Sequence, residues 1–307
     1  MPGPRPARHL AAPLATAWAL TALVGASPAA AQGCPPAGAP RETLQALAAD
    51  GWKLDDAARR EQLAIALLPC LADPDPVLRD DLALSALTAW LRGGGLTTAT
   101  ALRIGEWARG AMFGFGGDGF GPPFAALALA EVARVDRLQP IWTPTQREDA
   151  VDAAFEFMRR TQDYRGFDPQ AGWRHRVAHG ADLMVQLALN PQVERAGLDR
   201  LLEAVVSQAT PSSHFYVFGE GERLARVLVF VARRGLHTAD DWTALLGRVA
   251  LAGAPEPNAP ARLASLARRH NAKALLLPLY AALQEGNDTA ARERLLPGLR
   301  AALRTLW

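Results

Sequence analysis

The feature that most constrains the fold is a helical spacing of apolar residues that recurs along nearly the whole chain. In stretch after stretch, apolar side chains lie three or four residues apart, as on the buried face of an amphipathic helix. These stretches are residues 63–71, 78–91, 96–112, 124–135, 150–158, 173–189, 198–206, 224–231, 242–251 and 272–283. The two-residue alternation of strands does not recur in the same way. The sequence therefore predicts an all-α protein.

Short proline- and glycine-rich segments separate the helical stretches. They are residues 73–76, 93–95, 190–191, 219–221 and 253–255. Helices of about ten to eighteen residues joined by short loops favour antiparallel helix pairs stacked into an α/α superhelix. Asp75-Pro76 is a typical helix start, and residues 75–91 resemble one helix of a HEAT repeat. No strict repeat period is visible, so an irregular helical array stays open as the alternative.

The N-terminus has the pattern of a secretory signal peptide. Arg5 and Arg8 precede an apolar, charge-free stretch over residues 10–25, and Ala29-Ala30-Ala31 follows as a small-residue cleavage site. A retained anchor is the alternative, but the apolar stretch is shorter than the ~20 residues that a membrane span needs. No later segment is long and apolar enough to cross a bilayer. We therefore expect a periplasmic or secreted protein with no transmembrane span in the mature chain.

The predicted organisation has three parts: a signal peptide over residues 1–31, an N-terminal arm over 32–54 and a single all-α repeat-like domain over 55–307. Half of all residues are apolar, so the roughly 275 residues of the mature chain can bury a substantial core. Basic and acidic residues nearly balance, with a net charge of +2, and Lys occurs only at Lys53 and Lys273. No basic patch of the kind that follows a phosphate backbone is present, which argues against nucleic acid as a partner.

Cys34 and Cys70 are the only cysteines, and an oxidising compartment favours a disulfide between them. Such a bond would fix the N-terminal arm to the end of the first long helix. The alternative is a buried, unpaired Cys70 with a lipidated or disordered Cys34. Lipid attachment through Cys34 is disfavoured because Ala31 and Gln32 fit a lipoprotein cleavage site poorly.

A polar stripe on the stretch 173–189 contains the main candidates for chemistry. His175, His179, Asp182 and Gln186 are spaced so that they project from one face of a helix. Trp173 belongs to the opposite, apolar face, and we expect it to anchor the helix in the core rather than to stack on a ligand.

Histidines four residues apart on a helix have the spacing of zinc-binding helices. Zinc or another divalent metal at His175 and His179 is therefore one hypothesis, with Asp182 as a third ligand or as the group that orients His179. Glu222 is a candidate fourth group from another helix, or the acid of a metal-free acid/base site. Arg176 stands where a zinc protease has its glutamate, so that mechanism is not supported. Glu222 with Arg226 also fits a simple ion pair across one helical turn.

The loop before the stripe offers further candidates. Gly166 and Gly172 suggest tight turns that could bring Arg165 or Asp168 close to the stripe. Surface charges with no role in binding are an equal alternative for both residues.

Several segments together resemble the bacterial family called domain of unknown function 2785. They are residues 163–167, 172–183, 75–81, 124–127 and 219–225. The resemblance covers roughly residues 60–250 and includes Arg223, which we add to the candidate binding residues. The chain departs from the family pattern at Arg174 and Arg176, where small residues are usual, and this puts positive charge beside His175. The resemblance implies the domain but no activity.

We therefore expect a binding or scaffold protein whose polar concave site holds a peptide, a glycan or a protein. The candidate binding residues are Trp173, Arg165, Asp168, Gln186 and Arg223. The alternative is a hydrolase, with or without a metal, that uses His175, His179, Asp182 and Glu222.

Overall fold

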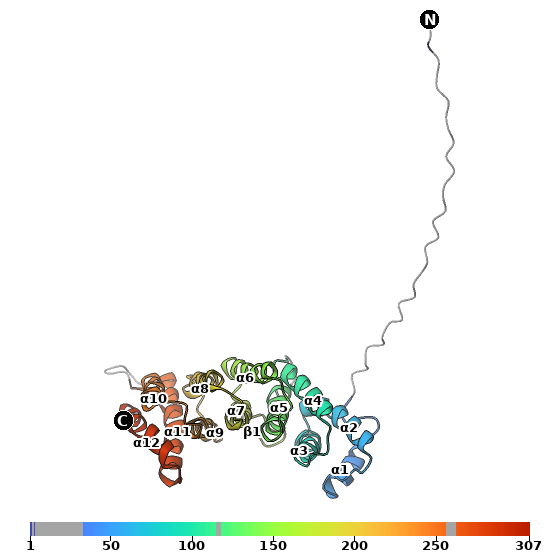
Figure 1. The fold of residues 1–307 in the computed structure, drawn as a ribbon, viewed down its shortest axis with the longest axis horizontal. Coiled ribbons are helices and arrows are strands. Elements are labelled where there is room, and N and C mark those ends of the chain that lie inside the picture. The colour runs from blue at the N-terminus through green and yellow to red at the C-terminus, as the bar shows by residue number, and fades with distance from the viewer. Residues whose placement is uncertain (2, 4–32, 115–117, 256–261) are drawn as a thin grey trace. The chain divides into compact units, whose positions relative to one another are not determined.

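The computed structural model describes residues 1, 3, 33–114, 118–255 and 262–307 (Figure 1). Over these residues the chain is helical almost throughout, which confirms the all-α prediction. The predicted signal peptide, apart from Met1 and Gly3, lies outside the described residues. In the described ranges, every helix is too short or too polar to cross a bilayer.

The helices within the described residues follow one another with short connections. They are α1 (Arg41–Ala49), α2 (Ala57–Ala66), η1 (Leu68–Ala72), η2 (Val77–Leu84), α3 (Ser85–Arg92), α4 (Thr98–Ala111), α5 (Gly121–Leu138), α6 (Pro144–Arg159), α7 (Arg176–Leu189), α8 (Arg195–Ala209), α9 (Glu220–Arg233), α10 (Ala239–Gly253), α11 (Leu263–Glu285) and α12 (Thr289–Thr305). Two short strands, β1 (Phe167–Asp168) and β2 (Gly172–Trp173), form an antiparallel hairpin before α7.

From α4 onward the helices alternate between two rows (Figure 1). One row packs α5 on α7, α7 on α9 and α9 on α11, while α6 and α8 pack on each other in the second row. Helix α7 also contacts both α6 and α8, so it is buried on several sides, with Leu183 and Met184 fully enclosed. Gly180 allows the close approach of α6, because a Cβ there would lie 2.4 Å from Sδ of Met158.

A buried ion pair links three helices of this array. Both carboxylate oxygens of Asp136, near the end of α5, accept hydrogen bonds from the Arg147 guanidinium of α6, at 2.8 and 3.0 Å. Asp136 also accepts a hydrogen bond from Asn190 Nδ2 at 2.7 Å and two from backbone amides of the α5–α6 loop. Burial raises the pKa of Asp136, but these hydrogen bonds and the Arg147 charge outweigh it, so that the pKa is lowered. The network fixes α5, α6 and the end of α7 to one another.

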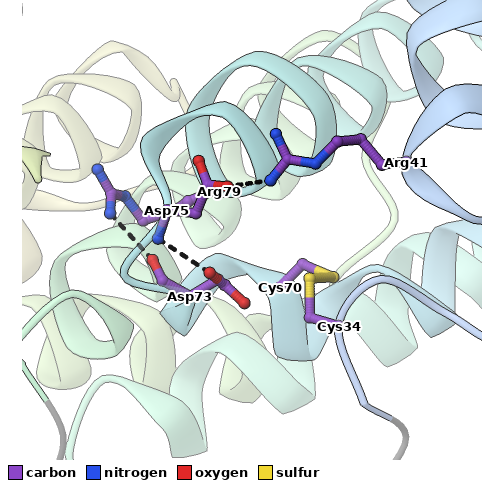
Figure 2. Close-up of a disulfide and its surroundings, with 6 residues drawn as sticks. All are labelled: Cys34, Arg41, Cys70, Asp73, Asp75 and Arg79. Carbon is purple, nitrogen blue, oxygen red and sulfur yellow. Dashed lines mark hydrogen bonds and ion pairs between the residues drawn. A yellow bond between two sulfur atoms is a disulfide. The ribbon is translucent and has the colours of Figure 1, made fainter.

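The predicted disulfide between Cys34 and Cys70 is confirmed (Figure 2). Cys70 lies in η1, directly after α2, and the bond closes a sequence separation of 36 residues. Residues 32–54, expected as an arm, include helix α1, which packs against η2. Arg41 of α1 pairs with Asp75 (Figure 2), and Asp75 also caps the next helix, since its Oδ1 accepts from Val77 N at 2.9 Å.

Several helices differ from the sequence expectation. Helix α7 begins at Arg176, so Trp173 and His175 are not part of it, and α1 and α12 were not expected at all. Helix α12 contains an internal Pro297, which argues locally against a helix. Burial of its apolar face against α10 and α11 stabilises the helix despite the proline.

Candidate functional site

The hairpin before α7 positions the first residues of the candidate site. The backbone amides of Arg174 and His175 donate to the carbonyls of Gly166 and Arg165, at 3.0 and 3.1 Å, which extends the pairing of β1 with β2. Asp168 caps the hairpin turn, with its Oδ1 accepting hydrogen bonds from the next loop amides at 2.9 and 2.7 Å. The hairpin thus fixes where the chain enters α7.

His175 is the N-cap residue of α7 and adopts a left-handed backbone conformation, with φ 51° and ψ 42°. For a non-glycine residue this conformation costs on the order of 1–3 kcal/mol, so the surrounding contacts must hold it. The imidazole stacks on the indole of Trp173, with ring centroids 4.7 Å apart. The expectation that Trp173 anchors the helix in the core is wrong, because Trp173 lies on β2 and is 39% exposed.

Trp173 and both histidines line an open pocket of about 370 Å³. The pocket residues come from η2, α5, α7, α9, the hairpin and the segment before α9. They are Asp80, Leu84, Phe124, Leu127, Trp173, His175, His179, Phe218 and Arg223. We call this the histidine pocket. Segments far apart in the sequence therefore build one site.

The two imidazoles are the chemically distinctive groups of the histidine pocket. Both residues are buried, with 8% of His175 and 9% of His179 exposed, and their ring centroids lie 5.8 Å apart. His175 Nε2 and His179 Nδ1 have no hydrogen-bond partner among the described residues. Burial lowers the pKa of His179 to about 3, and His175, Arg223 and Arg79 act in the same direction. Burial also lowers the pKa of His175, against the opposing charge of Glu220. Both imidazoles are therefore neutral at neutral pH, and these two unpaired ring nitrogens are enclosed by the protein.

A buried arginine orients the carboxylate of the pocket. Arg79 is fully buried, and its guanidinium donates to both oxygens of Asp80, at 3.3 and 2.9 Å, and to the Ala171 carbonyl of the hairpin at 2.8 Å. The guanidinium also lies over the Phe120 and Phe124 rings. Burial raises the pKa of Asp80, while the charge of Arg79 opposes the rise. Arg79 thus connects η2, α5 and the hairpin behind the pocket.

Arg223 of α9 also lines the pocket. Its guanidinium donates to Asp182 of α7, and Arg226 lies 3.9 Å from the same carboxylate. Asp182 is therefore committed to the arginines of α9, and in the described residues it accepts no hydrogen bond from His179. Glu222 is exposed and does not line the pocket, and Arg226 pairs with Asp182 instead of Glu222.

Three other sequence candidates lie outside the pocket lining. Arg165 pairs with Asp163 at 2.6 Å, Asp168 caps the hairpin turn, and Gln186 accepts a hydrogen bond from Arg137 at 3.3 Å. Of the predicted binding residues, the structure brings Trp173 and Arg223 together with His175 and His179.

The flanking arginines point away from the histidines. Arg174 donates to the Asp118 carbonyl at 2.7 Å, and Arg176 donates to Thr161 Oγ1 at 3.0 Å. The positive field at His179 comes instead from Arg223 and Arg79, because both charges lower its pKa.

Glu220 and Phe218 were not identified from the sequence. Glu220 is the first residue of α9 and is buried, and its Oε2 accepts from the Phe218 amide at 2.9 Å. This bond fixes the segment before α9, and that segment places the Phe218 ring at the edge of the pocket. The only local signal was a glutamate directly after Gly219, a typical helix start, and it does not indicate burial.

Among the described residues, no three His, Cys, Asp or Glu side chains are grouped so that they could hold one metal ion. His175 and His179 are the two histidines that line the pocket.

The sequence model of one protein family matches residues 118–281, and its description is "protein of unknown function (DUF2785)". A search of curated proteins and a search of solved structures found no match. The matched segment contains the hairpin, both histidines, Phe218 and Arg223, whereas Asp80 precedes it. The match covers more than half of the chain, and it confirms the resemblance noted in the sequence: the protein belongs to the DUF2785 family.

Proposed function

We propose that this protein is a binding protein that holds a small polar ligand in the histidine pocket. The single observation that carries the proposal is one open pocket of about 370 Å³ that two histidines, His175 and His179, line together with Asp80 and Arg223.

Preorganisation supports binding at this site. The left-handed His175, the buried Arg79 and the Asp182–Arg223 pair hold the lining side chains in place before any ligand arrives. A fixed site binds more tightly because less conformational entropy is lost on association. The exposed Trp173 ring adds an apolar surface at the pocket edge.

The proposed place of binding is the periplasm or the extracellular space. The Cys34–Cys70 disulfide supports it, since such bonds persist in oxidising compartments. Mass spectrometry of the protein recovered from a periplasmic fraction tests it: a mature N-terminus near Gln32 agrees with the proposal, and an intact chain in the cytoplasm contradicts it.

The binding proposal is tested by a thermal-shift screen of the full chain against sugars, sugar acids, amino acids, dipeptides and nucleosides. A ligand at about a hundred times its Kd stabilises the fold by about 2.7 kcal/mol, which raises Tm by a few degrees. The shift is expected to disappear in His175→Asn, because Asn tolerates the left-handed backbone but lacks the imidazole.

Trp307→Ala is the matched control, since this indole is exposed outside the pocket. A shift that survives His175→Asn, or that Trp307→Ala abolishes equally, contradicts binding in the histidine pocket. NMR of the bound compound over hours separates binding from hydrolysis: an unchanged spectrum is expected of a binding protein.

A further inference from the structure

Helix α7 exposes one narrow stripe of side chains. From Val177 to Leu189 its residues are buried apart from Asp182, Gln186 and Leu189, whose spacing of four and three residues places them on one side of the helix. Helices α5 and α9 pack against α7 in the same row (Figure 1). Side chains from both neighbours therefore border the stripe. We call this surface the α7 face, and its residues are Leu127, Arg134, Arg137, Leu138, Asp182, Gln186, Leu189, Arg223 and Arg226.

The α7 face carries four arginines around a single aspartate. Arg223 donates to Asp182, while Arg226, whose side chain is 54% exposed, lies 3.9 Å from the same carboxylate, too far for a hydrogen bond. Glu131 of α5 is already paired with an arginine of α3. The exposed Glu222 forms no ion pair with these arginines in the described part of the chain. The face is therefore left with more positive than negative charge.

Arg134 and Arg137 of α5 are the least compensated of these arginines. Among the described residues, no carboxylate pairs with either of them. Arg137 Nε donates to the neutral Gln186 at 3.3 Å, and the terminal amino groups of its guanidinium have no acceptor within the described ranges. Burial and the nearby charge of Arg134 both lower the pKa of Arg137. Two like charges held together in this way favour a bound anion, because the anion offsets their repulsion.

Apolar side chains lie among the arginines of the α7 face. Leu138 is 59% exposed, and Leu127 and Leu189 are half-buried. Leu127, Arg134 and Leu138 share one side of α5 because seven and four residues separate them. A guanidinium matches a carboxylate through two parallel hydrogen bonds, whereas the leucines match apolar side chains. The combination favours an acidic peptide with apolar residues over an anionic polysaccharide or a nucleic acid, whose units are polar or charged along the whole chain.

We infer that the α7 face binds an extended acidic segment of a partner protein, with its carboxylates on Arg134, Arg137 and Arg226 and its apolar side chains on the leucines. This site is separate from the histidine pocket, since none of these three arginines lines that pocket. Packed helices lie about 8–10 Å apart, so α5 to α9 span about 16–20 Å. An extended chain covers this distance with about five or six residues.

The test is fluorescence anisotropy of labelled nine-residue peptides titrated with the full chain in about 50 mM NaCl. The acidic probe repeats Glu-Glu-Leu three times, and the matched probes repeat Gln-Gln-Leu, Lys-Lys-Leu and Glu-Glu-Ser. The acidic probe is expected to bind saturably, with its Kd weakened about tenfold or more in about 500 mM NaCl, because salt screens the charges. The neutral and basic probes are expected not to bind, and the serine probe is expected to bind about fivefold more weakly.

Charge reversal identifies the arginines that carry the binding. The double variant Arg134→Glu, Arg137→Glu is expected to abolish binding of the acidic probe, and Arg226→Glu is expected to weaken it about tenfold. The matched control is Arg300→Glu, Arg304→Glu, because both are exposed arginines of one helix, α12, outside the face. It changes the net charge by the same amount and is expected to bind like the wild type. Circular dichroism checks folding, and Arg226→Glu still tests the inference if the α5 double variant fails to fold.

Several outcomes would overturn the inference. Unchanged binding in the α5 double variant and in Arg226→Glu would place the site elsewhere, and an equal loss in the α12 control would show that only net charge matters. A heparin octasaccharide and a nine-nucleotide single-stranded DNA are titrated alongside: if either binds through the α5 arginines and the acidic peptide does not, the peptide is the wrong partner class. Equal affinity for the serine probe would overturn the role of the leucines. Absence of binding of the acidic probe at millimolar concentration would overturn the inference and leave the histidine pocket proposal untouched.

Discussion

The lowered pKa of the buried His179 makes the stability of this protein depend on pH. Its ordinary pKa of 6.5 is lowered to about 3 in the folded state, mainly because burial disfavours the charged imidazolium. Above pH 6.5 both the folded and the unfolded chain hold a neutral His179, so the residue has no effect. Below pH 6.5 only the unfolded chain takes up the proton, and the free energy of unfolding therefore falls as pH falls towards 3.

The magnitude follows from one proton per molecule. Each pH unit in this window costs about 1.36 kcal/mol, so lowering the pH from 6.5 to 5.0 removes about 2 kcal/mol of stability through His179. His179→Phe removes the titrating group and keeps an apolar ring beside Phe124, which contacts the imidazole at 5.2 Å between centroids. The variant is expected to lose about 2 kcal/mol less than the wild type between pH 7 and pH 5.

Urea unfolding followed by circular dichroism at pH 7, 6 and 5 measures the difference. Phe157→Leu serves as the control, because it weakens the core without removing a titrating group and should follow the pH dependence of the wild type. If wild type and His179→Phe lost stability in parallel from pH 7 to pH 5, the assignment of His179 as a buried neutral imidazole would be refuted.

Three further perturbations test the framework around the site. Asp136→Asn leaves the buried Arg147 without its counter-charge, and urea unfolding should show a loss of about 3–5 kcal/mol; a loss below 1 kcal/mol would contradict the network. Reduction of the Cys34–Cys70 bond releases a loop of 36 residues, worth about 4 kcal/mol in the chain-entropy model, and an unchanged Tm under reducing conditions would contradict that role. Gly166→Ala places a methyl group 2.0 Å from an aromatic ring of the pocket edge, so ligand binding should weaken more than tenfold while circular dichroism still shows a folded helical protein; undiminished binding would show that this ring is not needed.

The helical spacing of the sequence was sufficient to predict the fold class because it is a local property. Apolar residues three or four apart mark the buried face of a helix whichever partner covers it, and nearly all of the expected stretches are helices in the structure. The Asp75-Pro76 helix start was predictable for the same reason, because a cap acts within one turn. The Cys34–Cys70 bond was predictable for a different reason, because two cysteines leave a single pairing. The stripe on α7 correctly drew attention to His179.

Where the site residues point was decided by tertiary contacts that spacing cannot encode. His175 lies outside the helix because the hairpin bonds its amide to Arg165, and Trp173 is exposed for the same reason. Asp182 faces Arg223 of α9 instead of a histidine, while Asp80, Phe124 and Phe218 reach the pocket only through helix packing.

The sequence by itself determined that this chain forms helices, which side of most of them is buried, and that it carries two histidines one turn apart. Only the tertiary structure decided that both imidazoles are buried, neutral and unpartnered beside an exposed indole. The physical reason is that helix formation and amphipathicity act over a few residues, whereas burial, charge pairing and pKa depend on neighbours up to a hundred residues away, such as Arg79 behind His179.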